Sequence, residues 1–293
     1  MKIKPLLLAC FLIILSSFKF TGGDLQNKIE TIISSTKADI GVAVMVPSSH
    51  DTILVNGMKP YTMMSVVKFP QAVYILSLVD RGKLRLSQKV NFDAAELQRK
   101  THSPMRDKYG KDPFEVTLEE TIMWAVSHSD NIACDRLFEL GGGVAANEKY
   151  FQDLGYHDFA IGVDYKHLDE KTMRANNTSP LTMTRILERF YNGKLLAGSS
   201  RNLLLKFMTQ SQNPEDRIKG NLPKGTVVAH KTGTSAAAEN GTIQVFNDVG
   251  IITLPSGKQI ILSVFVSASK EKSDDNAKAI AAIAKAVFDH YSN

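Results

Sequence analysis

The sequence predicts a mixed α/β fold of the α+β type, with a five-stranded antiparallel sheet and a separate all-helical lobe. Three observations support this. Strand-like segments occur only near the two chain ends, helix-like segments fill residues 62–212, and an amphipathic helical pattern closes each end of the chain. The chain has 293 residues, 43% hydrophobic and 22% charged, which is enough for a large buried core. Disordered and fibrous classes are therefore excluded.

The N-terminus has the layout of a secretory signal peptide. Lys2 and Lys4 precede an apolar run from Leu6 to Leu15, and small residues follow. The run is too short to span a bilayer. We expect residues 1–21 to be removed and a periplasmic protein without stable membrane insertion to remain. The alternative, a lipoprotein cleavage site at Cys10, has only a few apolar residues before the cysteine.

Charge and cysteine content limit the classes of partner. Without residues 1–21, 32 basic residues face 30 acidic ones, so the basic pI gives no reason to expect nucleic acid. Only Cys134 would remain, which excludes an intramolecular disulfide, and its apolar neighbours predict a buried, inert thiol. The seven histidines are scattered without metal-ligand spacing. We expect a monomer with no metal and no cofactor.

The two chain ends supply the predicted sheet. A helix is expected over 24–37, followed by a hairpin of strands 40–46 and 52–55. Near the other end, strands are expected at 226–230, 242–253 and 260–266, before a final helix over 273–290. Neither set of strands is large enough to stand alone, so one sheet built from both ends is the expected solution.

The middle of the chain has apolar residues spaced three and four apart, with almost no strand candidates. Helices are expected at 65–80, 117–127, 130–140, 144–154, 180–193 and 199–211. We therefore expect a single domain, residues 22–293, made of an α/β lobe (22–61 and 213–293) and a helical lobe (62–212). A site between lobes is the default expectation.

Ser65 and Lys68 carry the first chemical signal, in Ser65-Val66-Val67-Lys68. A spacing of three at the start of a helix places both side chains on one face, so the amine can reach the hydroxyl. A serine hydroxyl becomes a useful nucleophile when a neighbouring base takes its proton. Pro70 supports a helix start here, since proline is tolerated near the first turn. Alone, however, this motif occurs by chance in many chains.

A second signal, Ser129-Asp130-Asn131, lies between two apolar helical segments. Ser and Asp here could simply cap the following helix. In the functional interpretation, Ser129 relays a proton to a leaving nitrogen, Asn131 hydrogen-bonds a substrate amide, and Asp130 holds the loop.

A third signal, His230-Lys231-Thr232-Gly233-Thr234, ends a predicted strand. It would line a strand edge with an ammonium group, two hydroxyls and bare backbone, which a substrate can approach as an added strand. The simpler alternative is an ordinary edge strand protected by a lysine.

The three motifs occur in this order with spacings of 64 and 102 residues. Together they resemble the S-x-x-K, S-D-N and K-T-G signature of serine β-lactamases and penicillin-binding proteins. The spacing, the size and the Thr234-Ser235 continuation resemble class A β-lactamases, particularly the extended-spectrum branch with Cys134 after Ser-Asp-Asn. This likeness covers about residues 25 to 290.

The resemblance implies a role for each matching residue. Ser65 would be acylated, Lys68 would move protons, Ser129 would protonate the leaving group, and Asn131 would contact the substrate amide. The substrate carboxylate would be bound by a group of residues on the strand and a nearby loop: Lys231, Thr232, Gly233, Thr234 and Arg217. The backbone N–H groups of Ser65 and Thr234 would form an oxyanion hole. His102 falls where the family usually has an aromatic gate residue, and Arg217 could equally be a solvated loop arginine.

The same resemblance requires a glutamate that activates water for hydrolysis of the acyl-enzyme. Local matching favours Glu170, in Asp169-Glu170-x-x-Met173. Counting 36 residues from Ser129 instead reaches Tyr165, with fewer loop length changes. With Glu170, we expect a β-lactam hydrolase acting on a small-molecule substrate. Without a deacylating glutamate, the alternative is a penicillin-binding D,D-peptidase-like protein or a slow covalent trap.

Overall fold

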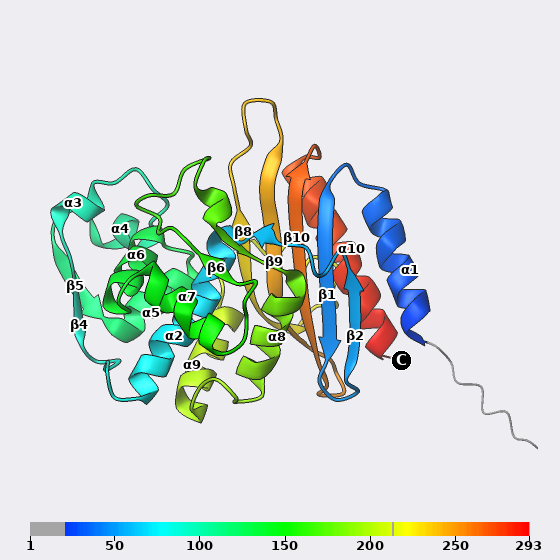
Figure 1. The fold of residues 1–293 in the computed structure, drawn as a ribbon, viewed down its shortest axis with the longest axis horizontal. Coiled ribbons are helices and arrows are strands. Elements are labelled where there is room, and N and C mark those ends of the chain that lie inside the picture. The colour runs from blue at the N-terminus through cyan, green and yellow to red at the C-terminus, as the bar shows by residue number, and fades with distance from the viewer. Residues whose placement is uncertain (1–20, 213, 293) are drawn as a thin grey trace, which may run out of the picture.

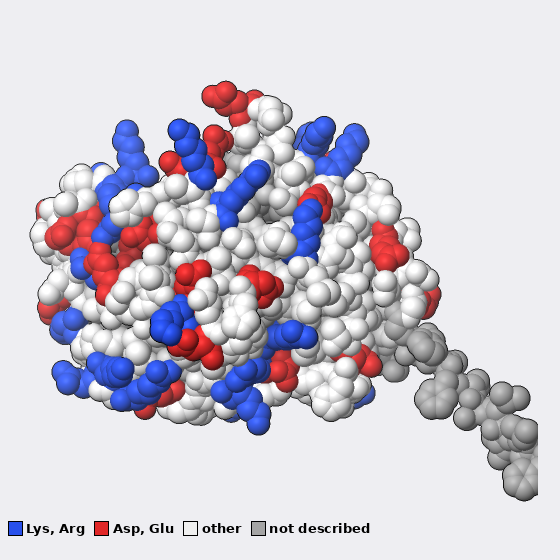
Figure 2. Space-filling view, in the orientation of Figure 1, with Lys and Arg blue, Asp and Glu red and all other residues white. Residues whose placement is uncertain are grey.

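The computed structural model describes residues 21–212 and 214–292. The predicted signal peptide, apart from its last residue, and the alternative cleavage site at Cys10 lie outside the described residues. Within the described part of the chain, no helix is both long and apolar enough to cross a membrane. Lysine and arginine side chains are interspersed with acidic ones over the face shown in Figure 2.

The predicted five-stranded antiparallel sheet is confirmed, and both chain ends build it (Figure 1). Its strands, in spatial order, are β2 (Asp51–Val55), β1 (Asp39–Val46), β10 (Gln259–Ser269), β9 (Ile243–Thr253) and β8 (Val227–Thr234). Strand β8 lies at the edge and runs four residues further than expected, so that Lys231-Thr232-Gly233-Thr234 belongs to the strand itself. One side of this motif is therefore free of a neighbouring strand.

Two terminal helices cover one face of the sheet. Helices α1 (Thr21–Ser34) and α10 (Ser273–Ser292) lie side by side there (Figure 1). Ile29 of α1 and Ile280 of α10 are fully buried in one apolar cluster with Val44 and Leu262 of the sheet. Removing such aliphatic side chains from water is what holds the two chain ends together.

The opposite face packs on the helical part of the molecule through α8 (Pro180–Tyr191). Here Phe265 and Ile261 of β10 join the larger apolar cluster. A buried hydrogen bond of 2.8 Å joins Thr184 Oγ1 of α8 to Ser263 Oγ of β10. The sheet and the helical part thus share a continuous core.

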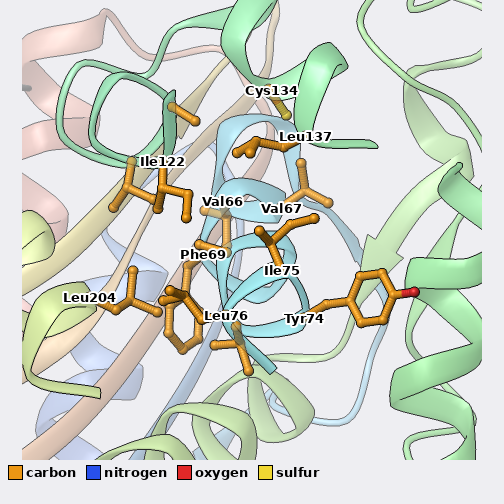
Figure 3. Close-up of a cluster of buried hydrophobic side chains, with 14 of the residues drawn as sticks. Val66, Val67, Phe69, Tyr74, Ile75, Leu76, Ile122, Cys134, Leu137 and Leu204 are labelled. Carbon is orange, nitrogen blue, oxygen red and sulfur yellow. The ribbon is translucent and has the colours of Figure 1, made fainter. Parts of the chain in front are cut away.

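Helix α2 (Lys68–Asp80), with the 3-10 turn η1 (Met64–Val67) before it, forms the centre of the helical part. Residues 68–78 are all buried, so this helix has no solvent face over that length. Figure 3 shows side chains from three directions packing around it. They come from α5 (Leu118–Ser127), α6 (Asn131–Leu140) and α9 (Gly198–Thr209). Helix α7 (Val144–Asp153) packs nearby.

Short strands between residues 62 and 178 are where the structure departs from the sequence expectation. They form two small sheets, β4 (Lys89–Phe92) with β5 (Phe114–Thr117), and β3 (Tyr61–Thr62), β7 (Asn176–Thr178) and β6 (Ala160–Ile161). Short helical turns also appear: α3 (Ala94–Leu97), α4 (Pro104–Tyr109) and η2 (Met173–Ala175). Segments of two to six residues are too short for hydrophobic periodicity to reveal them.

Candidate active site

The three sequence motifs meet in a cleft of about 700 Å³ between the β8 edge and the helical part. Its walls include Ser65, Ser129, Asn131, Thr232 and Thr234. Four basic side chains also line it: Arg99, Lys100, Lys166 and Arg217. Among the described residues, none that lines this cleft is acidic. The cleft therefore suits a small anionic ligand.

Ser65 lies in η1, one turn before the buried helix, as the motif predicted. Lys68 Nζ donates a hydrogen bond of 3.2 Å to Ser65 Oγ. The serine is partly exposed to the cleft, whereas Lys68 is fully buried. Met64, just before the serine, has a φ of 46°, a left-handed conformation that is uncommon outside glycine. Backbone strain of this kind concentrates at functional sites.

Lys68 is held by three further contacts around its ammonium group. Its Nζ lies 2.5 Å from the Ser129 main-chain oxygen, 2.6 Å from Asn131 Oδ1 and 3.4 Å from Ser129 Oγ. Burial lowers the pKa of Lys68 to about 8, because a charged amine loses hydration inside the protein. An amine with such a pKa has a sizeable neutral fraction near pH 7 and can accept a proton from the Ser65 hydroxyl.

Ser129 stands between two buried lysines. Lys231 Nζ donates a hydrogen bond of 3.1 Å to Ser129 Oγ, across from Lys68. Burial, and secondly the nearby Lys68, hold the pKa of Lys231 well below its ordinary value. Ser129 itself has a φ of 58°, a second strained residue at the site. Its hydroxyl is placed to pass a proton between an amine and a bound ligand.

Asp130 caps the helix and also holds the loop, as each interpretation of the motif expected of it. Asp130 caps α6 by accepting a 2.8 Å bond from Ala133 N, and it also accepts bonds from Ser103 Oγ and Met105 N. These bonds join the Ser129 loop to the chain at 103–105. Asn131 Nδ2 donates to Thr101 Oγ1 at 2.9 Å. This bond points the amide oxygen at Lys68.

Gly233 explains why bare backbone occurs in the edge strand. A Cβ atom there would lie 2.4 Å from the main-chain oxygen of Met63, far inside van der Waals contact. Strand β8 can therefore approach η1 closely only with glycine at this position. Thr232 is nearly buried, and Thr234 is exposed at the cleft.

Arg217 is not a solvated loop arginine, since only 4% of it is exposed. Its guanidinium donates to Thr234 Oγ1 at 2.7 Å and to the Asn247 main-chain oxygen at 2.6 Å, and it packs on the Phe246 ring. It reaches the cleft beside Thr234. His102 is exposed on the cleft wall, with Nε2 3.2 Å from the His128 main-chain oxygen.

The structure brings Tyr165, and not Glu170, to the nucleophile. The Tyr165 hydroxyl lies 3.1 Å from Ser65 Oγ, and Lys68 Nζ lies 4.4 Å from the centre of its ring. Glu170 is exposed and lines a neighbouring hollow of about 240 Å³. The residue found by counting from Ser129 therefore reaches the nucleophile, whereas Glu170 lies in a tight turn that Asp169 closes through its bonds to Thr172.

Asp135 and Arg99 were not among the predicted site residues. Asp135 Oδ1 accepts a 2.6 Å bond from Tyr165 N, and its other oxygen pairs with Arg99 at 2.7 Å. Burial raises the pKa of Asp135 to about 6 although Arg99 opposes this shift. The sequence held one weak signal for Asp135: it lies four residues after Asn131, one turn further along α6 on the same face.

Metal ligands are not gathered anywhere in the described residues: no group of three or more His, Cys, Asp or Glu side chains could hold an ion. The buried His230 of β8 lies with its Nδ1 3.0 Å from Asp248 Oδ1 of the neighbouring strand β9. Cys134 is free and buried, as predicted.

Comparison with known proteins finds beta-lactamases that are similar to this chain over most of its length. A sequence profile described as "Beta-lactamase enzyme family" matches residues 24–291. Beta-lactamase VEB-1 of Pseudomonas aeruginosa is 37% identical over 300 residues, covering 100% of both chains. Extended-spectrum beta-lactamase PER-1 of the same organism is 39% identical and covers 90% of this chain and 86% of its own. The crystal structure of TLA-3 extended-spectrum beta-lactamase superposes with a TM-score of 0.90 at 37% identity, covering 93% of this chain and 100% of the other.

Proposed function

Because the chain belongs to the beta-lactamase enzyme family, we propose that it is a serine hydrolase that opens β-lactam rings through an acyl-enzyme on Ser65. The observation that carries this proposal is the hydrogen bond between Lys68 Nζ and Ser65 Oγ inside a cleft that suits an anion. β-Lactams are small anionic cyclic amides. The cleft volume and its basic lining suit a ligand of this class.

Acylation follows from the distances around Ser65. Ser65 Oγ adds to the lactam carbonyl carbon as its proton passes to the neutral amine of Lys68, 3.2 Å away. The C–N bond of the ring then breaks, and the lactam nitrogen takes a proton from Ser129 Oγ. Ser129 is replenished by Lys68, whose Nζ lies 3.4 Å from it. The Ser65 proton thus ends on the leaving nitrogen, and an ester remains.

The substrate carboxylate would lie at the β8 edge. Thr234 is exposed there and accepts a hydrogen bond from the buried Arg217, while Lys231 donates a hydrogen bond to Ser129 Oγ nearby. The backbone N–H groups of Ser65 and Thr234 are the proposed oxyanion hole. Asn131 and His102 line the same cleft and are the proposed contacts for the amide side chain of a substrate.

A chromogenic cephalosporin and intact-mass spectrometry test the proposal together. We expect the protein to open the lactam ring and to gain one drug mass, and Ser65→Ala to do neither. A wild-type protein that gains no mass and shows no ring opening would exclude the proposed function.

The expected cellular setting is part of the proposal. The charged and apolar pattern of residues 1–21 supports export of the enzyme to the periplasm. We expect the exported enzyme to be a monomer. An exported β-lactam-opening enzyme would contribute to antibiotic resistance, which a susceptibility assay in a host expressing the full chain measures.

A further inference from the structure

Ser65 Oγ has two hydrogen-bond partners in the described residues, and one of them is a phenol. Lys68 Nζ lies 3.2 Å away and the Tyr165 hydroxyl 3.1 Å away. Tyr165 also covers the amine, since Lys68 Nζ sits 4.4 Å from the centre of its ring. The nucleophile and its base are therefore enclosed by the loop that carries Tyr165.

Tyr165 is held firmly in this place. Its main-chain N–H donates a 2.6 Å hydrogen bond to the buried Asp135, which itself pairs with Arg99. The next residue, Lys166, forms an ion pair with Glu139 of α6. These two contacts fix the loop against α6, so the phenol has a defined position in the site.

Hydrolysis of an ester on Ser65 requires a water molecule and a base within hydrogen-bond reach of it. Carboxylates are the usual bases for this purpose, but those near the site are committed elsewhere. Asp130 accepts bonds from three groups of its own loop and neighbours, and Asp135 is paired with Arg99. Within the described residues, no hydrogen bond or ion pair joins a carboxylate to Ser65 or Lys68.

The phenol of Tyr165 does not substitute for a carboxylate. Burial raises its pKa well above the ordinary value, so it stays protonated near neutral pH and takes no proton from water. Among the described residues, Lys68 remains as the only base in contact with Ser65, and its amine is covered by the Tyr165 ring. Acylation of Ser65 can therefore still use Lys68 as its base. A water molecule that attacks the ester has no carboxylate to activate it, and the Tyr165 ring covers the amine beside which it would bind.

We propose that Tyr165, in hydrogen-bond contact with Ser65 Oγ, makes hydrolysis of the acyl-Ser65 ester the slow step, so that the protein holds β-lactams covalently. This inference rests on the proposed function, since it needs the acyl-enzyme to form. In the slow step a water oxygen adds to the ester carbonyl and the Ser65 Oγ–carbon bond breaks. One water proton returns to Ser65 Oγ, and the other stays with the released acid.

The experiment follows the acyl-enzyme by intact-mass spectrometry. The mature full-length protein is acylated with benzylpenicillin, free drug is removed, and loss of the added mass is timed. We expect stoichiometric adduct that persists for many minutes. Tyr165→Glu should speed its loss by about 100-fold, the low end of what a positioned general base contributes. Tyr165→Phe should leave the loss slow, because the ring still covers the amine.

Two further variants on the same loop sharpen the result. His167→Glu, an exposed position two residues away, is the matched control that adds a carboxylate outside the site, and it should leave the adduct lifetime unchanged. Glu170→Gln separates the two candidate residues. If it prolongs the adduct as much as Tyr165→Glu shortens it, Glu170 is the base and the inference is overturned.

The outcomes for the unaltered protein distinguish the two proposals. Rapid ring opening without adduct accumulation overturns the inference about Tyr165 and leaves the proposed function standing. No adduct and no ring opening overturns the proposed function. Because these readings come from the wild-type chain, they hold even if Tyr165→Glu fails to fold.

Discussion

Titration of Lys68 is expected to control the rate of Ser65 acylation. Burial gives Lys68 a pKa of about 8. The neutral form, which accepts the serine proton, is then about one-eleventh of the total at pH 7 and about ten-elevenths at pH 9. The acylation rate constant should therefore rise about tenfold between these pH values and level off above pH 9. The sign follows from the role of Lys68 as a base, which works only when unprotonated.

Other groups around Lys68 also influence how the acylation rate depends on pH. Burial is the largest influence on its pKa, and the nearby carboxylates of Asp130 and Asp135 oppose it. Lys231 lies across Ser129 and also has a lowered pKa, so it affects binding of an anion as the pH rises. Measuring the first-order rate at saturating penicillin separates proton transfer by Lys68 from this effect on binding.

Rapid-quench mixing followed by intact-mass spectrometry between pH 6 and pH 10 gives the required rates. Lys68→Arg is the control, because a guanidinium stays protonated over this range and cannot act as the base. Its residual acylation should show no rise centred near pH 8. A wild-type rate that is flat or falling between pH 7 and pH 9 would refute the assignment of Lys68 as the base.

Three other substitutions test the architecture of the site. Asp130→Ala removes three buried hydrogen bonds and should lower the free energy of unfolding by about 3 kcal/mol in urea denaturation; unchanged stability would show that the loop does not depend on it. Gly233→Ala places a Cβ 2.4 Å from backbone and should reduce acylation at least about tenfold, while Gly198→Ala, with open space around it, should leave the rate unaltered. Arg217→Ala leaves Thr234 without its donor and should raise the penicillin concentration for half-maximal acylation about tenfold, an effect of about 1.4 kcal/mol. Equal acylation curves for Arg217→Ala and wild type would remove the arginine from anion binding.

The site contains two fully buried lysines, which the surrounding fold must hold in place. Lys68 and Lys231 are both 0% exposed, and among described residues neither forms an ion pair with a carboxylate. Burial of uncompensated amines is unfavourable and is tolerated where chemistry needs a base of lowered pKa. The large apolar core around α2, in Figure 3, supplies the rigidity that holds them there.

Features that depend on a local pattern of residues were predictable from the sequence. Periodicity placed the sheet strands, of five residues or more, and the long helices, of ten or more, because each repeats its buried face at least twice. The motif spacing of Ser65 and Lys68 also predicted their contact, since three residues span one helical turn. Strands of two to four residues, such as β6 and β7, escaped detection because they are too short to repeat.

Which loop residue contacts the nucleophile depends on packing between segments that are distant in the sequence. Tyr165 lies 100 residues from Ser65 in sequence and 3.1 Å from it in space, and the Asp135 carboxylate of α6 holds its main-chain N–H. Local matching favoured Glu170 because residue type is visible in a sequence, whereas the path of a loop is not. The same holds for Arg217, whose burial behind Thr234 depends on packing between separate segments. The sequence alone thus predicted a reactive serine, and long-range packing decided what surrounds it.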